Sequence, residues 1–144
     1  MTNPLREPAT FTSNYWAERA EALRAAVAIG KSDLDPVVLE VALRGAEDVL
    51  QLEVELADSP LVGWTYNDNE VSDLVAARSA DQTLAILKAE YPERAHYPEC
   101  IDRVDDNGFM NRTWCFEETP EEKFTWPEFI KRITIPRHLA GVFN

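Results

Sequence analysis

The sequence predicts a predominantly helical α+β fold, with about four N-terminal helices, then a small β-hairpin and one or two short C-terminal helices. Before Pro92, apolar side chains recur at helical spacing. After Pro92, that periodicity gives way to turn-forming residues and shorter apolar stretches. With 144 residues, 45% of them hydrophobic, the chain is expected to form a single domain over residues 1–144, with 1–12 as its candidate disordered segment.

The first two helices are predicted from signals at their ends. Ser13 can cap a helix over residues 14–29, and Gly30 supplies its stop. A proline follows Asp35, and proline is favoured at the first helical position because its missing N–H would have no partner there. The apolar pattern then predicts a second helix over residues 36–58, about six turns long.

The remaining helices are predicted from capping signatures. Residues 59–67 combine helix breakers with two aromatic residues and are expected to be a linker. Residues 68–78 begin with Asp-Asn, which can cap a short third helix. Residues 79–82 form a capping-box sequence that starts a fourth helix, ending before the next proline. Similar helix-start signatures at residues 119–122 and 125–128 predict the short C-terminal helices.

A β-hairpin is predicted around Asn107-Gly108, because both residues tolerate the positive φ of a type I′ turn. In a two-residue turn, Cys100 would lie directly opposite Cys115, where the two thiols either form a disulfide or pack as small buried groups. A four-residue turn is the alternative. The apolar tail, residues 133–143, is expected to be extended or to form a short turn.

Acidic residues are concentrated in one part of the chain. The formal net charge is −12, and residues 33–73 hold eleven acids but only one base, Arg44. A surface with this charge attracts basic partners or metal ions and repels nucleic acid and anionic lipid. The chain also shows neither a signal-peptide pattern nor an apolar run of the ~18 residues that a membrane span needs. The sequence therefore predicts a cytoplasmic protein that binds neither nucleic acid nor membrane directly.

The predicted helix over residues 36–58 gathers many of these acids on one side. At about 100° per residue its polar side chains form a stripe, and apolar side chains cover the rest of its circumference. The carboxylates would pair with lysines or arginines of a partner, and aromatic residues after the helix would either pack against the core or anchor that partner. The predicted partner-binding residues are Glu40, Glu47, Asp48, Glu55, Asp58, Trp64, Tyr66, Glu70 and Asp73.

Glu53 does not follow this pattern, because it projects into the apolar side of the same helix. A buried carboxylate without a partner would cost several kcal/mol. We expect an ion pair with an arginine of the first helix, such as Arg19 or Arg24. A functional carboxylate and a subunit contact are the alternatives.

The acids also form a pair of short motifs. Glu47-Asp48-x-x-Gln51 is followed, after eighteen residues, by Glu70-x-x-Asp73. This pair resembles the acidic motifs on two helices of the all-α nucleoside triphosphate pyrophosphatases, the MazG-like family. The resemblance implies a magnesium ion held by Glu47, Asp48, Glu70 and Asp73, which bridges a triphosphate and activates water. Gln51 stands where the family has a charged ligand.

Other catalytic and metal-binding patterns are incomplete. His96, Cys100, Cys115 and His138 are zinc-type donors, but the chain has no Cys-x-x-Cys knuckle. Each histidine is expected at the surface. Residues 25–32 match a relaxed phosphate-loop pattern but are expected to be the end of the first helix.

The sequence therefore favours a small acidic interaction protein without a cofactor, rather than an enzyme. Its carboxylate-rich helix face would bind a basic protein surface, such as that of a nucleic-acid-binding protein. It would act as a nucleic-acid-mimicking inhibitor or as an immunity or anti-defence protein. The alternatives are the magnesium-dependent pyrophosphatase and a subunit of a viral or multiprotein assembly, for which a homo-oligomer is possible.

Overall fold

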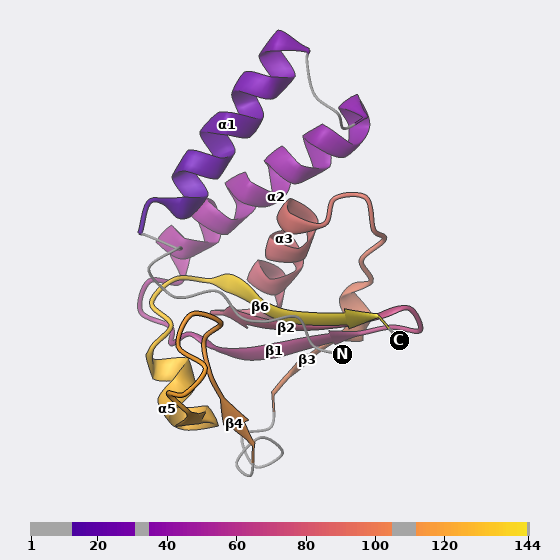
Figure 1. Ribbon diagram of the computed structural model, residues 1–144. Coiled ribbons are helices and arrows are strands. Elements are labelled where there is room, and N and C mark those ends of the chain that lie inside the picture. Colours follow the sequence, from indigo (N-terminus) through magenta and orange to yellow (C-terminus); the bar gives the residue numbers. More distant parts are fainter. Residues whose placement is uncertain (1–12, 31–34, 105–111, 144) are drawn as a thin grey trace.

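A computed structural model describes residues 13–30, 35–104 and 112–143. A four-stranded antiparallel sheet, in the order β3-β1-β2-β6, lies below three helices and above a smaller unit that contains α5, β4 and β5 (Figure 1). The elements are α1 (Tyr15–Ile29), α2 (Pro36–Glu55), β1 (Val62–Asn67), β2 (Val71–Ala77), α3 (Ala80–Glu90), the 3₁₀ helix η2 (Pro98–Cys100), β3 (Ile101–Arg103), β4 (Thr113–Trp114), β5 (Phe124–Thr125), α5 (Trp126–Lys131) and β6 (Arg137–Phe143).

The first two predicted helices are confirmed as α1 and α2. Asn14, not Ser13, is the N-cap residue of α1, and Gly30 ends the helix with a left-handed φ of 71°. Asp35 caps α2 by accepting a hydrogen bond from the backbone N–H of Val37 at 2.8 Å. The two helices lie side by side and extend away from the sheet (Figure 1).

The predicted fold is wrong between residues 59 and 78, where the structure has a β-hairpin instead of a linker and a third helix. Two N-terminal helices, rather than about four, are thus followed by a four-stranded sheet. Asp68 does cap backbone N–H groups, but those of Glu70 and Val71 in the turn between β1 and β2. These bonds, the one from Val71 above all, hold the pKa of Asp68 below its usual range.

The predicted fourth helix is confirmed as α3. The Ser79 hydroxyl caps it by accepting a hydrogen bond from the backbone N–H of Gln82 at 3.0 Å. The helix packs on α2 at Gly45, where an added Cβ would lie 2.7 Å from the Ala89 nitrogen and 2.8 Å from the Ala85 oxygen. A glycine is therefore required for the close approach of the two helices.

The predicted hairpin between the two cysteines is wrong in its pairing. β3 follows Cys100 and pairs with β1, whereas β4, just before Cys115, pairs with β5 in a separate two-stranded sheet. The turn at Asn107-Gly108 lies outside the described residues. Of the C-terminal helix signatures, residues 125–128 begin α5, while residues 119–122 form turns. The apolar tail is extended as β6, one of the two alternatives expected for it.

Apolar side chains fill both faces of the sheet. The face toward the helices packs side chains of β1 and β2 against α1, α2 and α3, with Trp16 and Val49 among the buried residues. The opposite face packs Leu74 and Ala140 against Trp126 and Phe129 of α5. None of the helices in the described ranges combines the length and hydropathy that a membrane crossing requires.

Candidate functional site

The outer face of α2 carries the acidic residues predicted to bind a partner. The inner face of this helix is buried through Leu39, Ala42, Ala46 and Val49, which fixes the rotation of the helix about its axis. The outer side chains are exposed, and they include Glu40, Glu47, Asp48, Glu55 and, just after the helix, Asp58. We call these five carboxylates the α2 acidic face. The sequence predicted this arrangement from helical spacing alone.

The α2 acidic face includes one exposed base, Arg44, which lies one turn from Glu40 and from Asp48 but forms no ion pair within the described ranges. Glu47 lies 3.6 Å from the guanidinium of Arg24 on α1, but both side chains are about half exposed, so solvent screens this pair. Glu55 accepts a hydrogen bond from Gln51 at 3.0 Å. The other three carboxylates make no ion pair with any residue in the described ranges. Most of the acidic face is thus available to an external cation.

Two valines lie exposed on the outer side of the same helix. Val37 is 70% exposed and Val54 is 78% exposed. An apolar side chain among carboxylates offers a partner protein a hydrophobic contact, which exposed charges alone do not provide.

Trp64 and Tyr66 pack against the core, which is one of the two alternatives expected for them, and do not form an exposed aromatic anchor. Tyr66 is completely buried, donates a hydrogen bond to Asp68 at 2.8 Å and accepts one from the backbone of Tyr97. Burial is the largest of the causes that raise its pKa to about 12. The Trp64 indole donates to the carbonyl of Ala77 at 3.1 Å. Both residues therefore stabilise the sheet rather than the outer surface.

Glu53 forms an ion pair with an arginine, as expected. The arginine is Arg78, which precedes α3, rather than one of the first helix. The Arg78 Nε lies 2.6 Å from Glu53 Oε1, and Gln82 donates to the same oxygen at 2.8 Å. These contacts join the end of α2 to the start of α3. Arg19 instead lies 3.6 Å from Glu90.

The two acidic motifs do not lie on two helices, as the resemblance to the pyrophosphatases implies. Glu70 is exposed in the turn between β1 and β2, and Asp73 is buried within β2. Glu47 and Asp48 lie on the outer side of α2. Within the described ranges, no three His, Cys, Asp or Glu side chains are grouped closely enough to hold a metal ion. The implied magnesium site is thus not assembled.

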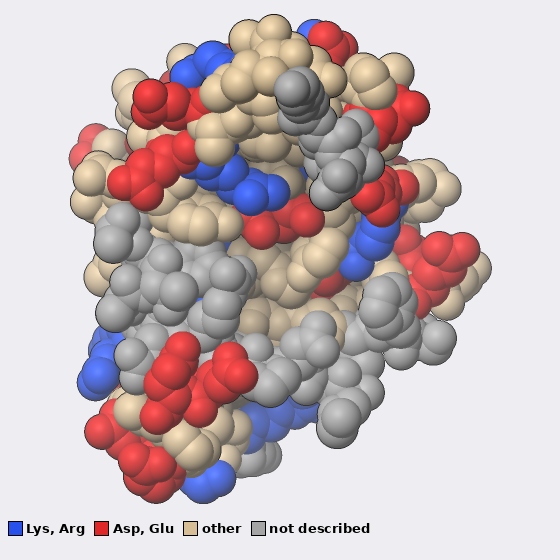
Figure 2. Space-filling view, turned by 45° about the horizontal axis from the view of Figure 1, so that its top comes forward, with Lys and Arg blue, Asp and Glu red and all other residues tan. Residues whose placement is uncertain are grey.

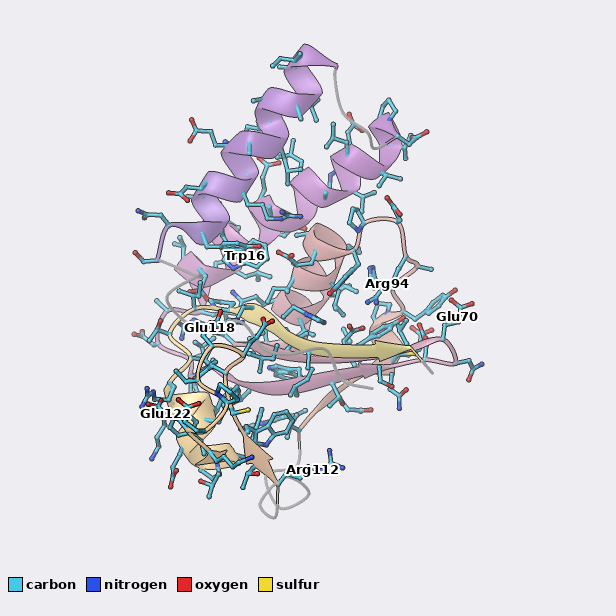
Figure 3. The ribbon with its side chains drawn as sticks, viewed as in Figure 1. Trp16, Glu70, Arg94, Arg112, Glu118 and Glu122 are labelled. Carbon is cyan, nitrogen blue, oxygen red and sulfur yellow. The ribbon has the colours of Figure 1, made fainter. Side chains whose placement is uncertain are left out.

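Asp73 forms a polar network that the sequence did not predict. Its side chain is 1% exposed and accepts hydrogen bonds from Arg94 at 2.7 Å and from His138 Nε2 at 2.8 Å. The Arg94 guanidinium lies 4.3 Å from the centre of the Tyr91 ring. Figure 3 shows Arg94 between the α3–η2 loop and the sheet. An added Cβ at Gly141 would lie 2.8 Å from Asp73 Oδ1, so glycine is needed beside this carboxylate.

The geometry of this network assigns a role to each ring nitrogen of His138. Nε2 donates to Asp73, which leaves Nδ1 as the acceptor for the Tyr91 hydroxyl at 3.4 Å. The imidazole side chain is only 10% exposed, so the expected surface position of His138 is wrong. The Arg94 guanidinium compensates the charge of the buried carboxylate, and the imidazole donates a hydrogen bond to its other oxygen. We therefore assign the network to holding β6 and the α3–η2 loop on β2.

Neither cysteine nor histidine chemistry is supported by the arrangement of these residues. Both cysteines are free thiols; Cys100 ends η2, whereas Cys115 follows β4 of the two-stranded sheet. Burial raises the pKa of the Cys100 thiol, which disfavours its nucleophilic thiolate form. His96 is partly buried, and its Nε2 donates to the carbonyl of Tyr91 at 2.9 Å. Burial also lowers the pKa of His96, which favours the neutral imidazole.

A second group of acids was not singled out from the sequence. Glu117, Glu118, Glu121 and Glu122 are all exposed in the segment between β4 and β5. They lie beside α5, where Figure 2 shows acidic side chains gathered at the lower left and Figure 3 labels two of them. We call these four residues the β4–β5 acidic group. The signal for it was present as two Glu-Glu pairs separated by Thr-Pro.

Comparisons with protein-family models, with curated proteins and with solved structures gave no match to this chain. The case for a function therefore depends on the geometry of the residues described above.

Proposed function

We propose that this protein binds a basic surface of a macromolecular partner through the α2 acidic face. The observation that carries the proposal is the exposure of four carboxylates along one side of α2 and of Asp58 just after it. Only Glu47 among them forms an ion pair within the described part of the chain. A rigid helix holds these charges at fixed spacing, so it can match a fixed pattern of lysines and arginines.

The charge of the face also suggests which partners it binds. Surfaces that bind nucleic acid are rich in lysine and arginine, and a row of carboxylates on a helix can occupy such a surface in place of phosphates. Val37 and Val54, exposed among the acids, add apolar contacts that phosphates cannot provide. We therefore propose a nucleic-acid-binding protein as the partner and inhibition of that partner as the outcome.

The test compares two variants with the same net charge. In one, Glu40, Glu47 and Glu55 are changed to Gln. In the control, Glu117, Glu118 and Glu121 of the β4–β5 acidic group are changed to Gln. Proteins captured from a cell extract by the immobilised wild-type chain are identified, purified and titrated against all three chains at low and high ionic strength.

We expect one purified partner to bind the wild-type chain and the control with similar affinity. The same partner should bind the α2 variant at least about tenfold more weakly, because three charge pairs are lost. Its affinity for the wild-type chain should fall steeply as salt is raised. Equal weakening by both variants would mean that net charge, not this face, is recognised. An affinity that is indifferent to salt would contradict the electrostatic account.

A further inference from the structure

A groove lies between α2 and α3 at the edge of the α2 acidic face. It encloses about 310 Å³, which is large enough for a single side chain but small for a drug-sized ligand. Its walls come from one stripe of each helix: its lining residues are Asp48, Gln51, Leu52, Asp81, Leu84, Ala85 and Lys88.

The way the two helices are joined fixes the position of this groove. The helices approach most closely at Gly45, which faces Ala85 and Ala89. Directly after Leu52, Glu53 accepts a hydrogen bond from Gln82 of α3 at 2.8 Å. The groove is therefore part of a packed helix pair and does not depend on a loop for its shape.

The lining of the groove has an apolar floor and charged walls. Leu52 and Leu84 are half-buried and leave part of their side chains open to the groove. Asp48 on α2 and Asp81 on α3 are both exposed, and neither makes an ion pair or hydrogen bond through its side chain within the described ranges. Lys88 also lines the groove, so two acids and one base give it a net charge of −1.

We propose that this groove binds one arginine side chain of the macromolecular partner. The inference rests on the proposed function, and it names the chemical group that the acidic surface recognises. The aliphatic stem of the arginine lies along Leu52 and Leu84, and the guanidinium donates hydrogen bonds to a carboxylate of either wall. The net charge of −1 is complementary to one cation. Arginine suits the groove better than lysine, because the guanidinium is more weakly hydrated and donates in a planar fork.

The test uses small probes, so it does not require the partner to be identified. The isotope-labelled full chain is titrated with acetyl-arginine-amide, with acetyl-lysine-amide and with acetyl-citrulline-amide, which has the shape of arginine without its charge. Backbone amide shifts are followed by NMR. The Asp81→Asn variant changes the groove and leaves the α2 acidic face intact. The control, Glu117→Gln, removes one charge from the β4–β5 acidic group, which does not line the groove.

We expect the arginine probe to shift the amides of Leu52, Leu84 and Ala85, with weaker shifts for lysine and none for citrulline. Asp81→Asn should weaken arginine binding about threefold to fivefold, and Glu117→Gln should leave it unchanged. Equal shifts for citrulline, shifts spread over all acidic surfaces, or no effect of Asp81→Asn would each overturn the groove proposal.

The two proposals can fail separately. If the α2 variant loses the captured partner while no probe binds the groove, the proposed function holds and the arginine site does not. If the arginine probe binds the groove while the α2 variant retains every partner, the arginine site exists but the proposed function is wrong.

Discussion

Asp73 is a charged residue buried within the sheet. Its side chain is 1% exposed, and its two oxygens accept hydrogen bonds from different segments of the chain, one from Arg94 and one from His138. A buried carboxylate is tolerated only when its charge is compensated in this way. The network therefore compensates the burial of the Asp73 carboxylate and connects β2 to β6 and to the loop after α3.

Changing Asp73 to Asn should destabilise the protein by about 3 kcal/mol, because it leaves the partly buried Arg94 and His138 without their anionic partner. The free energy of unfolding is measured by urea denaturation. Asp102→Asn is the matched control, since Asp102 is an exposed carboxylate on β3 of the same sheet. Its change should fall within about 0.5 kcal/mol of wild type. Similar losses from both variants would show that the network contributes nothing specific.

Among the elements, α2 and α3 have the most demanding contact. Gly45 allows the two helices to approach so closely that a methyl group would meet backbone atoms rather than a flexible side chain. Alanine would raise intrinsic helix propensity by up to about 1 kcal/mol. Steric overlap with a backbone that cannot move costs more than that gain.

Gly45→Ala should therefore lower the free energy of unfolding by about 1–2 kcal/mol in spite of its better helix propensity. Thermal and urea unfolding both measure this change. Gln51→Ala, an exposed position on the same helix, is the control and should be neutral or slightly stabilising. If Gly45→Ala stabilised the protein as much as the control, the close approach of the helices would be in doubt.

Helices were easier to predict from the sequence than strands. The ends of α1, α2 and α3 are marked locally by Gly30, Asp35 and Ser79, which act on residues one to four positions away. The strand β2 has no such signal, because it is stabilised by pairing with β1 on one side and with β6 on the other. Asp68 was ambiguous, since a side chain that caps a helix can equally cap a turn.

For the candidate site, too, local features could be predicted from the sequence and long-range contacts could not. The α2 acidic face could be predicted, because helical spacing alone decides which residues share a side. For Trp64 and Tyr66 the sequence left two alternatives, the core and the surface. The side chains of alternate residues share one face of a strand, but this rule could not decide between the alternatives while the segment was assigned as a linker. Asp73, Arg94 and His138 meet only after the sheet has formed, so no local pattern connects them.

At the scale of the whole molecule, negative charge is carried on two separate surfaces. The α2 acidic face lies above the sheet, and the β4–β5 acidic group lies beside α5 (Figures 1 and 3). With a net charge of −12, repulsion among carboxylates destabilises the compact state. Folding stability should accordingly depend on ionic strength.

Raising the sodium chloride concentration should raise the melting temperature by about 3 °C, which corresponds to roughly 1 kcal/mol. A variant with Gln at all four positions of the β4–β5 acidic group should melt higher at low salt and respond less to added salt. Potassium chloride should give the same result, because screening does not depend on the identity of the cation. A melting temperature that stays constant or falls with salt would show that repulsion is not significant.

The pairing of β2 with β6 has a consequence for how the chain folds as it is synthesised. The two strands are separated by about sixty residues, so closing the sheet is slower than forming α1 or α2. Until residue 138 has left the ribosome, the carboxylate of Asp73 lacks its histidine partner and the outer edge of β2 lacks its neighbour. The helical pair can therefore form early, whereas the sheet is completed only after nearly all of these residues have been made.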